Sequence, residues 1–276
     1  MTDPRPCRAF LVDIEGVLVR DKRYLPIAGA VAWLENLEAR GLPWCLVSNN
    51  TSHAPEDLVS DLRHAGFPVT LERLVGVLGL GAQWLRQRGR RRIHWLGRPA
   101  LADWWRGQGF ALVGPDDCET VVLGVNAHLT VEALDAVLPA LHDRQVELLC
   151  LHRNGFWLDD RSGRRLGPGA WAAALAAAAP ATRVVTVGKP AEPIYHEALK
   201  RVAAAPADTL FISDDPVADL VTAARLGMRT AFVLSGKFAD CSVLGTLDQE
   251  QWPHIIGGSL ADIDPDGTGA DAPMKG

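Results

Sequence analysis

Short apolar segments that end abruptly on polar residues alternate along this chain with segments of helical spacing. The stretches 9–14 (AFLVDI) and 44–48 (WCLVS) each have the length and composition of a buried strand. Apolar residues at helical spacing follow them at 31–37 and 55–66. Strands and helices in this order are typical of a parallel sheet with crossover helices. We therefore predict an α/β fold with a Rossmann-like, doubly wound parallel sheet.

The same alternation continues through the rest of the chain. Further strands are expected at 93–96, 120–125, 147–152, 184–187, 209–213 and 230–234. Further helices are expected at 78–88, 99–107, 130–143, 170–179 and 192–205, with another that ends at 226. The Gly- and Arg-rich stretch 153–169 predicts a loop or hairpin. From residue 257 onward the chain is rich in Gly, Asp and Pro, and we expect a flexible tail at 257–276.

Charge and composition exclude several classes of protein. The chain has 28 Lys and Arg against 33 Asp and Glu, and the resulting net charge of −5 argues against a protein that coats nucleic acid. The longest run of small and apolar residues, 170–179, is too short to span a membrane. The five cysteines do not have the spacing of zinc ligands. Because no apolar leader follows the polar start, we expect a cytoplasmic protein with reduced thiols and no nucleic-acid or membrane partner.

Polar side chains gather where four of the expected strands end. The groups are Asp13 with Glu15, Ser48 with Asn49, Lys189, and Asp214 with Asp215 and Asp219. Ligands of open parallel sheets bind at the carboxyl ends of the strands, so we expect these distant groups to meet in space. Several carboxylates packed together repel one another unless a cation neutralises them. Oxygen ligands of this kind suit Mg²⁺.

The residue types at these positions suit phosphoryl transfer. Asp13 could attack phosphorus and form an aspartyl-phosphate, and Glu15, two residues on, could act as general acid and base. Gly16 lets the chain turn sharply after them. Ser48 and Asn49 offer a hydroxyl and amide donors to phosphate oxygens. Lys189, in an extended backbone before Pro190, would be a fixed positive charge for the phosphate.

Four motifs in this order resemble those of phosphatases of the haloacid dehalogenase superfamily. They are Asp13-Ile14-Glu15-Gly16-Val17, Ser48-Asn49-Asn50, Gly188-Lys189-Pro190 and Ser213-Asp214-Asp215-Pro216-Val217-Ala218-Asp219. The long insert between the second and third motifs resembles the α/β cap of subclass IIA, which contains the NagD-type and 4-nitrophenylphosphatase-like enzymes. This resemblance implies a discontinuous core domain of residues 1–77 and 184–256 and a smaller inserted α/β cap domain at 78–183. Leu166-Gly167-Pro168-Gly169 and Ser235-Gly236-Lys237-Phe238 are similar to the branch of the phospholysine phosphohistidine inorganic pyrophosphate phosphatases.

The resemblance implies a role for each residue that matches a motif. Asp13 would be the nucleophile and a Mg²⁺ ligand, with Asp214 and the backbone carbonyl of Glu15 as further ligands. Ser48, Asn49 and Lys189 would bind the phosphoryl group, and Asp219, less clearly Asp215, would act around the metal ligands. Glu15 stands where the family usually has Asp. Ser213 replaces the usual Gly, and its side chain is expected to narrow the space beside the metal.

The leading hypothesis is a Mg²⁺-dependent phosphatase of a small phosphorylated metabolite, which would pair through its cap as a homodimer if it follows its subclass. Three alternatives stay open: a family member that binds phosphate with little turnover, a phosphoacceptor module of the receiver type, and a carbon–halogen hydrolase. Each residue also has a structural interpretation: Asp13 as a turn residue, Ser48 and Asn49 as helix caps, and Asp215 and Asp219 as first-turn acids. His152, Arg153, Arg164 and Arg165 are further candidates for contacts with the leaving group.

Overall fold

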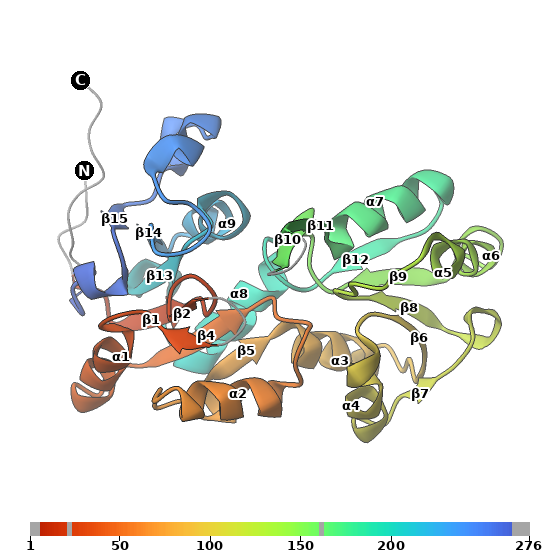
Figure 1. Cartoon of the computed structure of the whole chain (residues 1–276), viewed down its shortest axis with the longest axis horizontal. Coiled ribbons are helices and arrows are strands. Elements are labelled where there is room, and N and C mark those ends of the chain that lie inside the picture. The colour runs from red at the N-terminus through yellow and green to blue at the C-terminus, as the bar shows by residue number, and fades with distance from the viewer. Residues whose placement is uncertain (1–5, 21–23, 160–162, 267–276) are drawn as a thin grey trace. The chain divides into compact units, whose positions relative to one another are not determined.

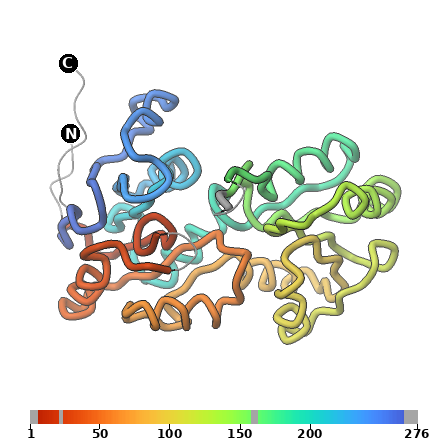
Figure 2. The backbone as a smooth tube through the Cα atoms, in the orientation of Figure 1, coloured from red at the N-terminus to blue at the C-terminus, as the bar shows by residue number. Residues whose placement is uncertain are grey.

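The computed structural model describes residues 6–20, 24–159 and 163–266, which fall into two compact units. The first unit comprises 1–48, 56–75 and 195–276, and the second comprises 49–55 and 76–194. Figure 1 labels the helices and strands, and Figure 2 traces the chain out of the first unit after residue 75 and back at residue 195. The second unit is therefore largely one long insertion into the first.

A six-stranded sheet forms the centre of the first unit, in the order β15-β14-β13-β1-β4-β5. Its strands are β1 (Ala9–Val12), β4 (Trp44–Ser48), β5 (Leu74–Gly76), β13 (Thr209–Ser213), β14 (Arg229–Val233) and β15 (Ile255–Gly257). Strand β1 pairs in parallel with both β13 and β4. From β1 the chain builds the sheet first toward β5 and later toward β15, so the direction of construction reverses between β1 and β13.

Helices flank this sheet and complete its core. They are α1 (Ala30–Ala39), α2 (Pro55–His64), α8 (Glu192–Val202) and α9 (Val221–Arg225), and a small antiparallel pair, β2 (Val19–Arg20) and β3 (Leu25–Pro26), lies after β1. Helix α2 has acids in its first turn and bases in its last, which suits the helix dipole. The ring of Trp33 on α1 packs edge-on against Phe10 of β1, with ring centroids 5.6 Å apart. Both side chains belong to the apolar core of this unit.

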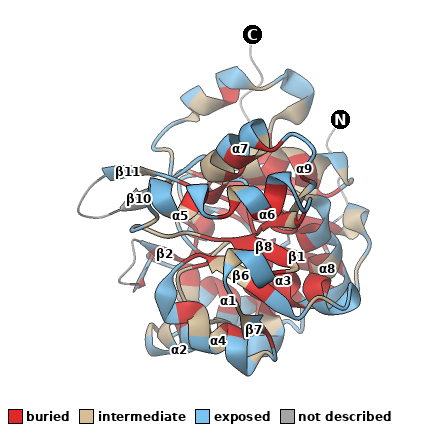
Figure 3. Cartoon of the chain, turned by 90° about the vertical axis from the view of Figure 1, so that its right-hand side faces the viewer, coloured by how far each residue is buried: buried red, intermediate tan, exposed pale blue. Residues whose placement is uncertain are grey.

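The second unit has a five-stranded sheet of its own, in the order β12-β9-β8-β6-β7. Its strands are β6 (Arg92–Leu96), β7 (Ala111–Leu112), β8 (Thr120–Leu123), β9 (Glu147–Cys150) and β12 (Val184–Thr186), and a hairpin is formed by β10 (Phe156–Asp159) and β11 (Gly163–Leu166). Its helices are α3 (Val77–Gln87), α4 (Ala102–Gly107), α5 (Val131–Asp135), α6 (Leu138–His142) and α7 (Pro168–Ala178). In Figure 3 strands β1 and β8 are buried, whereas the outer parts of α2 and α4 are exposed.

The predicted fold class is confirmed, and so is the hairpin within 153–169. The helix expected at 130–143 is two short helices, because Pro139 lacks a backbone N–H and clashes with the preceding turn. Strand β12 pairs with β9 of the second sheet, although we expected residues from 184 onward in the core domain. A buried apolar strand has the same sequence pattern in either sheet, so the pattern does not show which strand it pairs with.

We predicted that the flexible tail begins at residue 257, and this boundary is wrong. Strand β15 ends at Gly257, but Leu260 and Ile263 beyond it are fully buried in the first unit, and the indole N–H of Trp33 donates to the carbonyl of Ile263 at 2.6 Å. The remainder of the predicted tail, 267–276, lies outside the described residues. Among the described residues, none of the helices combines the length and apolar character needed to cross a bilayer.

Candidate active site

Two of the predicted acids lie at the carboxyl ends of neighbouring central strands. Asp13 directly follows β1 and Asp214 directly follows β13, at the point where the direction of sheet construction reverses. The backbone N–H of Asp13 still donates to the carbonyl of Ile212 at 3.0 Å, so the ladder between the strands holds Asp13 in place. Parallel sheets bind their ligands at such a switch point. The two carboxylates are 7% and 8% exposed, so the sheet both places and buries them.

The hydroxyl of Ser213 lies among three of the aspartates. Its oxygen is 2.6 Å from Oδ2 of Asp219 and 3.3 Å from Oδ2 of Asp13, and it accepts the backbone N–H of Asp215 at 3.1 Å. Ser213 is fully buried. The side chain that replaces the usual glycine is therefore part of the hydrogen-bond network around the acids.

Asp215 and Asp219 are held by the turn of helix that follows β13. Oδ1 of Asp215 accepts the backbone N–H of Ala218 at 3.0 Å, which caps that turn. The carbonyl of Asp219 accepts the hydroxyl of buried Tyr195 at 2.9 Å. Burial, together with the charges of Asp219, Asp13 and Asp215, raises the pKa of this phenol, so Tyr195 stays protonated and donates.

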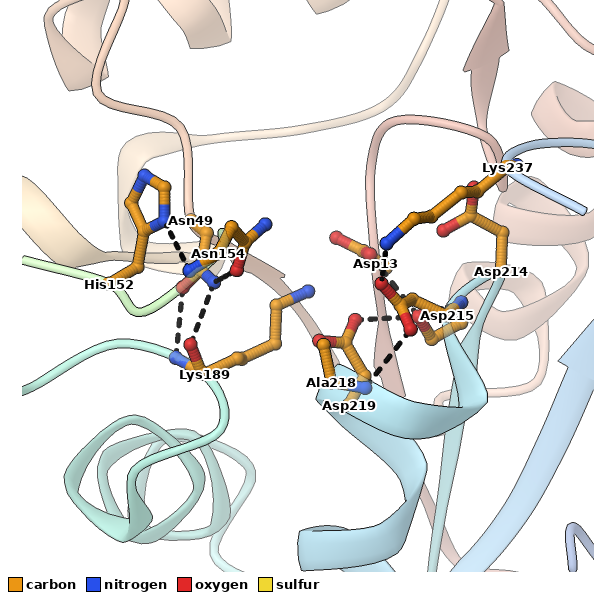
Figure 4. Close-up of polar contacts among 11 residues, drawn as sticks. Asp13, Asn49, His152, Asn154, Lys189, Asp214, Asp215, Ala218, Asp219 and Lys237 are labelled. Carbon is orange, nitrogen blue, oxygen red and sulfur yellow. Dashed lines mark hydrogen bonds and ion pairs between the residues drawn. The ribbon is translucent and has the colours of Figure 1, made fainter. Parts of the chain in front are cut away.

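The segment after β14 crosses the same carboxylates. The backbone N–H of Lys237 donates to Oδ2 of Asp214 at 2.6 Å, and its ammonium group lies 2.5 Å from Oδ2 of Asp215. The hydroxyl of Ser235 donates to the carbonyl of Gly16 at 2.6 Å. Figure 4 shows Lys237 reaching over Asp13, Asp214 and Asp215. The segment therefore joins the loop after β1 to the loop after β13.

Two glycines leave room for the carboxylate of Asp214. Gly16 has a φ of 80°, and a Cβ atom there would overlap Oδ2 of Asp214. A Cβ atom at Gly236 would overlap the same oxygen and lie 2.5 Å from Cα of Gly16. Only glycine suits both the backbone angle and the close approach at Gly16. The turn predicted at Gly16 is thus required by the packing of the acid.

The buried acids repel one another, and the effect is clearest at Asp214. Burial and the nearby charge of Asp13 raise the pKa of the Asp214 carboxyl well above its usual range, and the hydrogen bond from Lys237 only partly offsets this. A divalent cation would remove that repulsion. Within the described ranges, groups of three or more His, Cys, Asp or Glu side chains in metal-binding arrangement are absent. The set implied by the resemblance needs only two carboxylates and a backbone carbonyl, so the donors present fit Mg²⁺.

Ser48 and Glu15 occupy different surroundings. Ser48 is the last residue of β4 and is completely buried, two positions beyond Leu46, which pairs with Val12 of β1. It thus ends beside β1 at the same edge of the sheet as Asp13. Glu15 is exposed on the turn after Asp13, and its backbone forms an isolated β-bridge with Val19. Its side chain is open to solvent, as exchange of protons with water requires.

Asn49 and Lys189 belong to the second unit and are bonded to each other. The side chain of Asn49 accepts the backbone N–H of Lys189 at 2.9 Å and donates to the carbonyl of Lys189 at 3.0 Å. Its amide nitrogen also lies 3.3 Å from Oδ1 of Asn154. Both amide protons therefore have acceptors, and the side chain positions Lys189 rather than facing phosphate. Lys189 is 2% exposed, and Figure 4 shows it beside Asn49, Asn154 and His152.

Two residues of the acidic site escaped a functional assignment from the sequence, Lys237 and Ser235. The segment Ser235-Gly236-Lys237 begins two residues after β14, so it lies at a strand end like the other motifs. The same strand-end rule could have identified it.

Comparison with known proteins identifies the same family at both ends of the chain. The haloacid dehalogenase-like hydrolase profile matches residues 10–111, and a second profile of related hydrolases matches residues 186–263. The chain is 29% identical to haloacid dehalogenase-like hydrolase domain-containing protein 2 of Rattus norvegicus, over 93% of this chain and 97% of the relative. It is 27% identical to the phospholysine phosphohistidine inorganic pyrophosphate phosphatase of Bos taurus, over 84% of each chain. The p-nitrophenyl phosphatase from Archaeoglobus fulgidus has the same fold, with a TM-score of 0.82 and 24% identity over 93% of this chain and 98% of the other.

Proposed function

We propose that this chain catalyses a Mg²⁺-dependent reaction that proceeds through an aspartyl-phosphate on Asp13. The chain belongs to the haloacid dehalogenase-like hydrolases and is a phosphatase of subclass IIA. The substrate is a small phosphorylated metabolite. The observation that carries this proposal is the pair of buried carboxylates, Asp13 and Asp214, at the ends of neighbouring strands. A nucleophile and a cation can be held side by side only where such groups converge.

In the first half of the reaction a carboxylate oxygen of Asp13 attacks phosphorus. The new O–P bond forms as the bond between phosphorus and the leaving-group oxygen breaks, and Glu15 gives its proton to that oxygen. Ser48, the backbone N–H of Asn49 and the ammonium of Lys189 bind the phosphoryl oxygens. Ser48 and Asn49 are consecutive, and Asn49 is hydrogen-bonded to Lys189, which supports their common role.

In the second half Glu15 takes a proton from water, and the oxygen of that water attacks phosphorus. The bond to Asp13 breaks, and inorganic phosphate leaves with the carboxylate restored. The hydroxyl of Ser213, which is also bonded to Asp219, lies against Asp13 and holds it, and Lys237 holds Asp214 and Asp215. Mg²⁺, held by Asp13, Asp214 and the carbonyl of Glu15, would neutralise negative charge on the phosphoryl oxygens.

The test is phosphate release from 4-nitrophenyl phosphate with Mg²⁺, with a chelator, and in Asp13→Asn. We expect turnover that requires Mg²⁺ and falls at least about a thousandfold in Asp13→Asn. Asp103→Asn removes an exposed acid on α4 and serves as the matched control, with activity unchanged. Turnover that persists in Asp13→Asn would exclude Asp13 as nucleophile. If a small phosphodonor labelled the wild-type protein stoichiometrically without turnover, this would favour the alternative of a family member that binds phosphate without hydrolysing it efficiently.

A further inference from the structure

The segment after β14 carries a positive charge into the acidic site. The ammonium group of Lys237 lies 2.5 Å from Oδ2 of Asp215, and Figure 4 shows the side chain extended over Asp13 and Asp214 as well. The Lys237 side chain is 28% exposed, whereas Asp13 and Asp214 are only 7% and 8% exposed. The ammonium group is therefore open to an incoming solute, although the carboxylates beside it are buried.

Contacts at both ends of the Lys237 side chain hold it in place. At its base, the backbone N–H donates to Oδ2 of Asp214 at 2.6 Å. At its tip, the ammonium group lies 5.4 Å from the centroid of the Phe238 ring, within the range of a cation–π contact. That ring packs edge-on against the buried ring of Phe232. A side chain that is placed before its ligand arrives loses little conformational freedom on binding.

The negative charges at this edge of the sheet disfavour the approach of a phosphate dianion. The phosphoryl group that Asp13 attacks must enter beside four buried carboxylates, those of Asp13, Asp214, Asp215 and Asp219. One Mg²⁺ neutralises two of these four charges, and Lys237 is placed to neutralise a third. The phosphoryl group would meet two uncompensated negative charges without Lys237 and one with it.

Lys237 and the four acids belong to the same compact unit. Residues 1–48 and 195–276 lie in the first unit, whereas Lys189, the lysine expected at phosphate, lies in the second. The arrangement of Lys237 and the acids is therefore a property of the first unit alone. An ammonium group has three N–H donors, so contact with Asp215 is compatible with donation to a second oxygen. Hydrogen bonds from an ammonium group to phosphate oxygens are charge-assisted and strong.

We propose that Lys237 is a phosphate-binding residue, whose ammonium group donates a hydrogen bond to an oxygen of the phosphoryl group at Asp13. This inference rests on the proposed function for the identity of the ligand. Lys237 keeps its contact with Asp215 while it binds the phosphoryl oxygen, so that acid sets the direction in which the ammonium group points. Asp215 is then the residue that positions Lys237.

Two binding constants of Lys237→Met separate this role from a structural one. Calorimetric titration of the full chain with inorganic phosphate at saturating Mg²⁺ should show an affinity about 10- to 100-fold weaker than that of wild type, because a charge-assisted hydrogen bond is lost. Titration with Mg²⁺ alone should show a several-fold tighter affinity, because the acids lose a competing cation. A side chain that only supported the fold of the site would weaken both affinities together, and that outcome would overturn the proposal.

Two further variants serve as controls. Lys237→Arg keeps the charge, and its affinity for inorganic phosphate should stay within a few fold of wild type. Lys200→Met removes an exposed lysine in the last turn of α8 and should leave both affinities unchanged. Phosphate affinity that is unchanged in Lys237→Met, or lost equally in Lys237→Arg or Lys200→Met, would overturn the proposal.

A spectroscopic measurement follows the ammonium group itself in the wild-type chain. In ¹⁵N–¹H spectra of the lysine ammonium groups at saturating Mg²⁺, the Lys237 resonance is the one that is absent from Lys237→Arg. Addition of inorganic phosphate should move this resonance, and an unmoved resonance at saturation contradicts the contact. The test also stands apart from the proposed function. A wild-type chain that releases no phosphate from 4-nitrophenyl phosphate would defeat the proposed reaction, whereas an active chain whose phosphate affinity is indifferent to Lys237→Met would defeat only this inference.

Discussion

The backbone amide of Lys237 donates a hydrogen bond of 2.6 Å to Oδ2 of Asp214, although 23 positions separate the two residues. The side chain of the same lysine reaches Asp215. One residue from the segment after β14 therefore orients one carboxylate through its main chain and neutralises another through its side chain. The two contributions can be separated by substitution, because a change of side chain leaves the backbone N–H in place.

Lys237→Met removes the charge beside Asp215 and keeps the bond to Asp214. The Lys237 side chain is 28% exposed and that of Asp215 is 9% exposed, so loss of the pair should lower the free energy of unfolding in chelator by about 1–2 kcal/mol. The more negative site should also bind Mg²⁺ several-fold more tightly. Urea unfolding and Mg²⁺ titration of phosphatase activity measure the two effects, with Lys237→Arg as the control that keeps the charge. A weaker Mg²⁺ requirement for the arginine variant alone would contradict this account.

Gly16→Ala should damage the site more than its backbone angle explains. Gly16 and Gly41 both have positive φ, but a Cβ atom at Gly41 meets nothing within 4 Å. We expect Gly41→Ala to cost about 1 kcal/mol of unfolding free energy and to leave activity intact. Gly16→Ala should cost more and reduce kcat/KM at least tenfold, because Asp214 must move. Equal effects on activity would show that the close approach to Asp214 is unimportant.

Burial of neutral His152 predicts a loss of stability in acid. The unfolded chain takes up a proton near the ordinary pKa of 6.5, whereas the folded chain does so only near 4. Between these values the unfolded state binds more protons, so this residue's contribution to the free energy of unfolding falls as the pH falls, by roughly 3 kcal/mol in all. Urea unfolding of wild type and His152→Gln from pH 7 to 4 should show the difference between them narrowing. A constant difference would mean that His152 titrates alike in both states.

Ile263→Ala tests whether the end of the described chain belongs to the core. Ile263 is 1% exposed and lies among core side chains of the first unit. Its truncation should lower the free energy of unfolding by about 2–4 kcal/mol. Val131→Ala, at a side chain that is 62% exposed, should change it by less than about 0.5 kcal/mol. If both substitutions changed the free energy of unfolding by a similar amount, the segment around Ile263 would not be part of the core.

The acidic site was predictable because a parallel sheet brings the ends of its strands to one edge. Asp13, Ser48 and Asp214 each lie at or directly after a strand whose apolar run is visible in the sequence. Helices and strands with strong patterns, such as α8 and β13, were also expected within a few residues of their bounds.

What the sequence left open depends on contacts between distant segments. Lys237 contacts Asp214 through its backbone N–H, and a backbone contact cannot be predicted from the residue type. The side chain of Asn49, which we expected to bind phosphate, instead holds the backbone of Lys189. Strand β5 has only three residues and β7 only two, too few for a periodic pattern. The burial of Ile263 likewise follows from its contact with Trp33, 230 positions away.

The glycine bonds at the base of the β10–β11 hairpin have a consequence for how this loop can change during evolution. Gly167 and Gly169 close the loop on Gly155 and Asn154, and the paired strands β10 and β11 lie between these bonds in the sequence. Exchanges in its paired strands can therefore accumulate without breaking these two backbone bonds. A library confined to the paired positions Phe156–Asp159 and Gly163–Leu166 would therefore vary the hairpin while the bonds at its base stay in place.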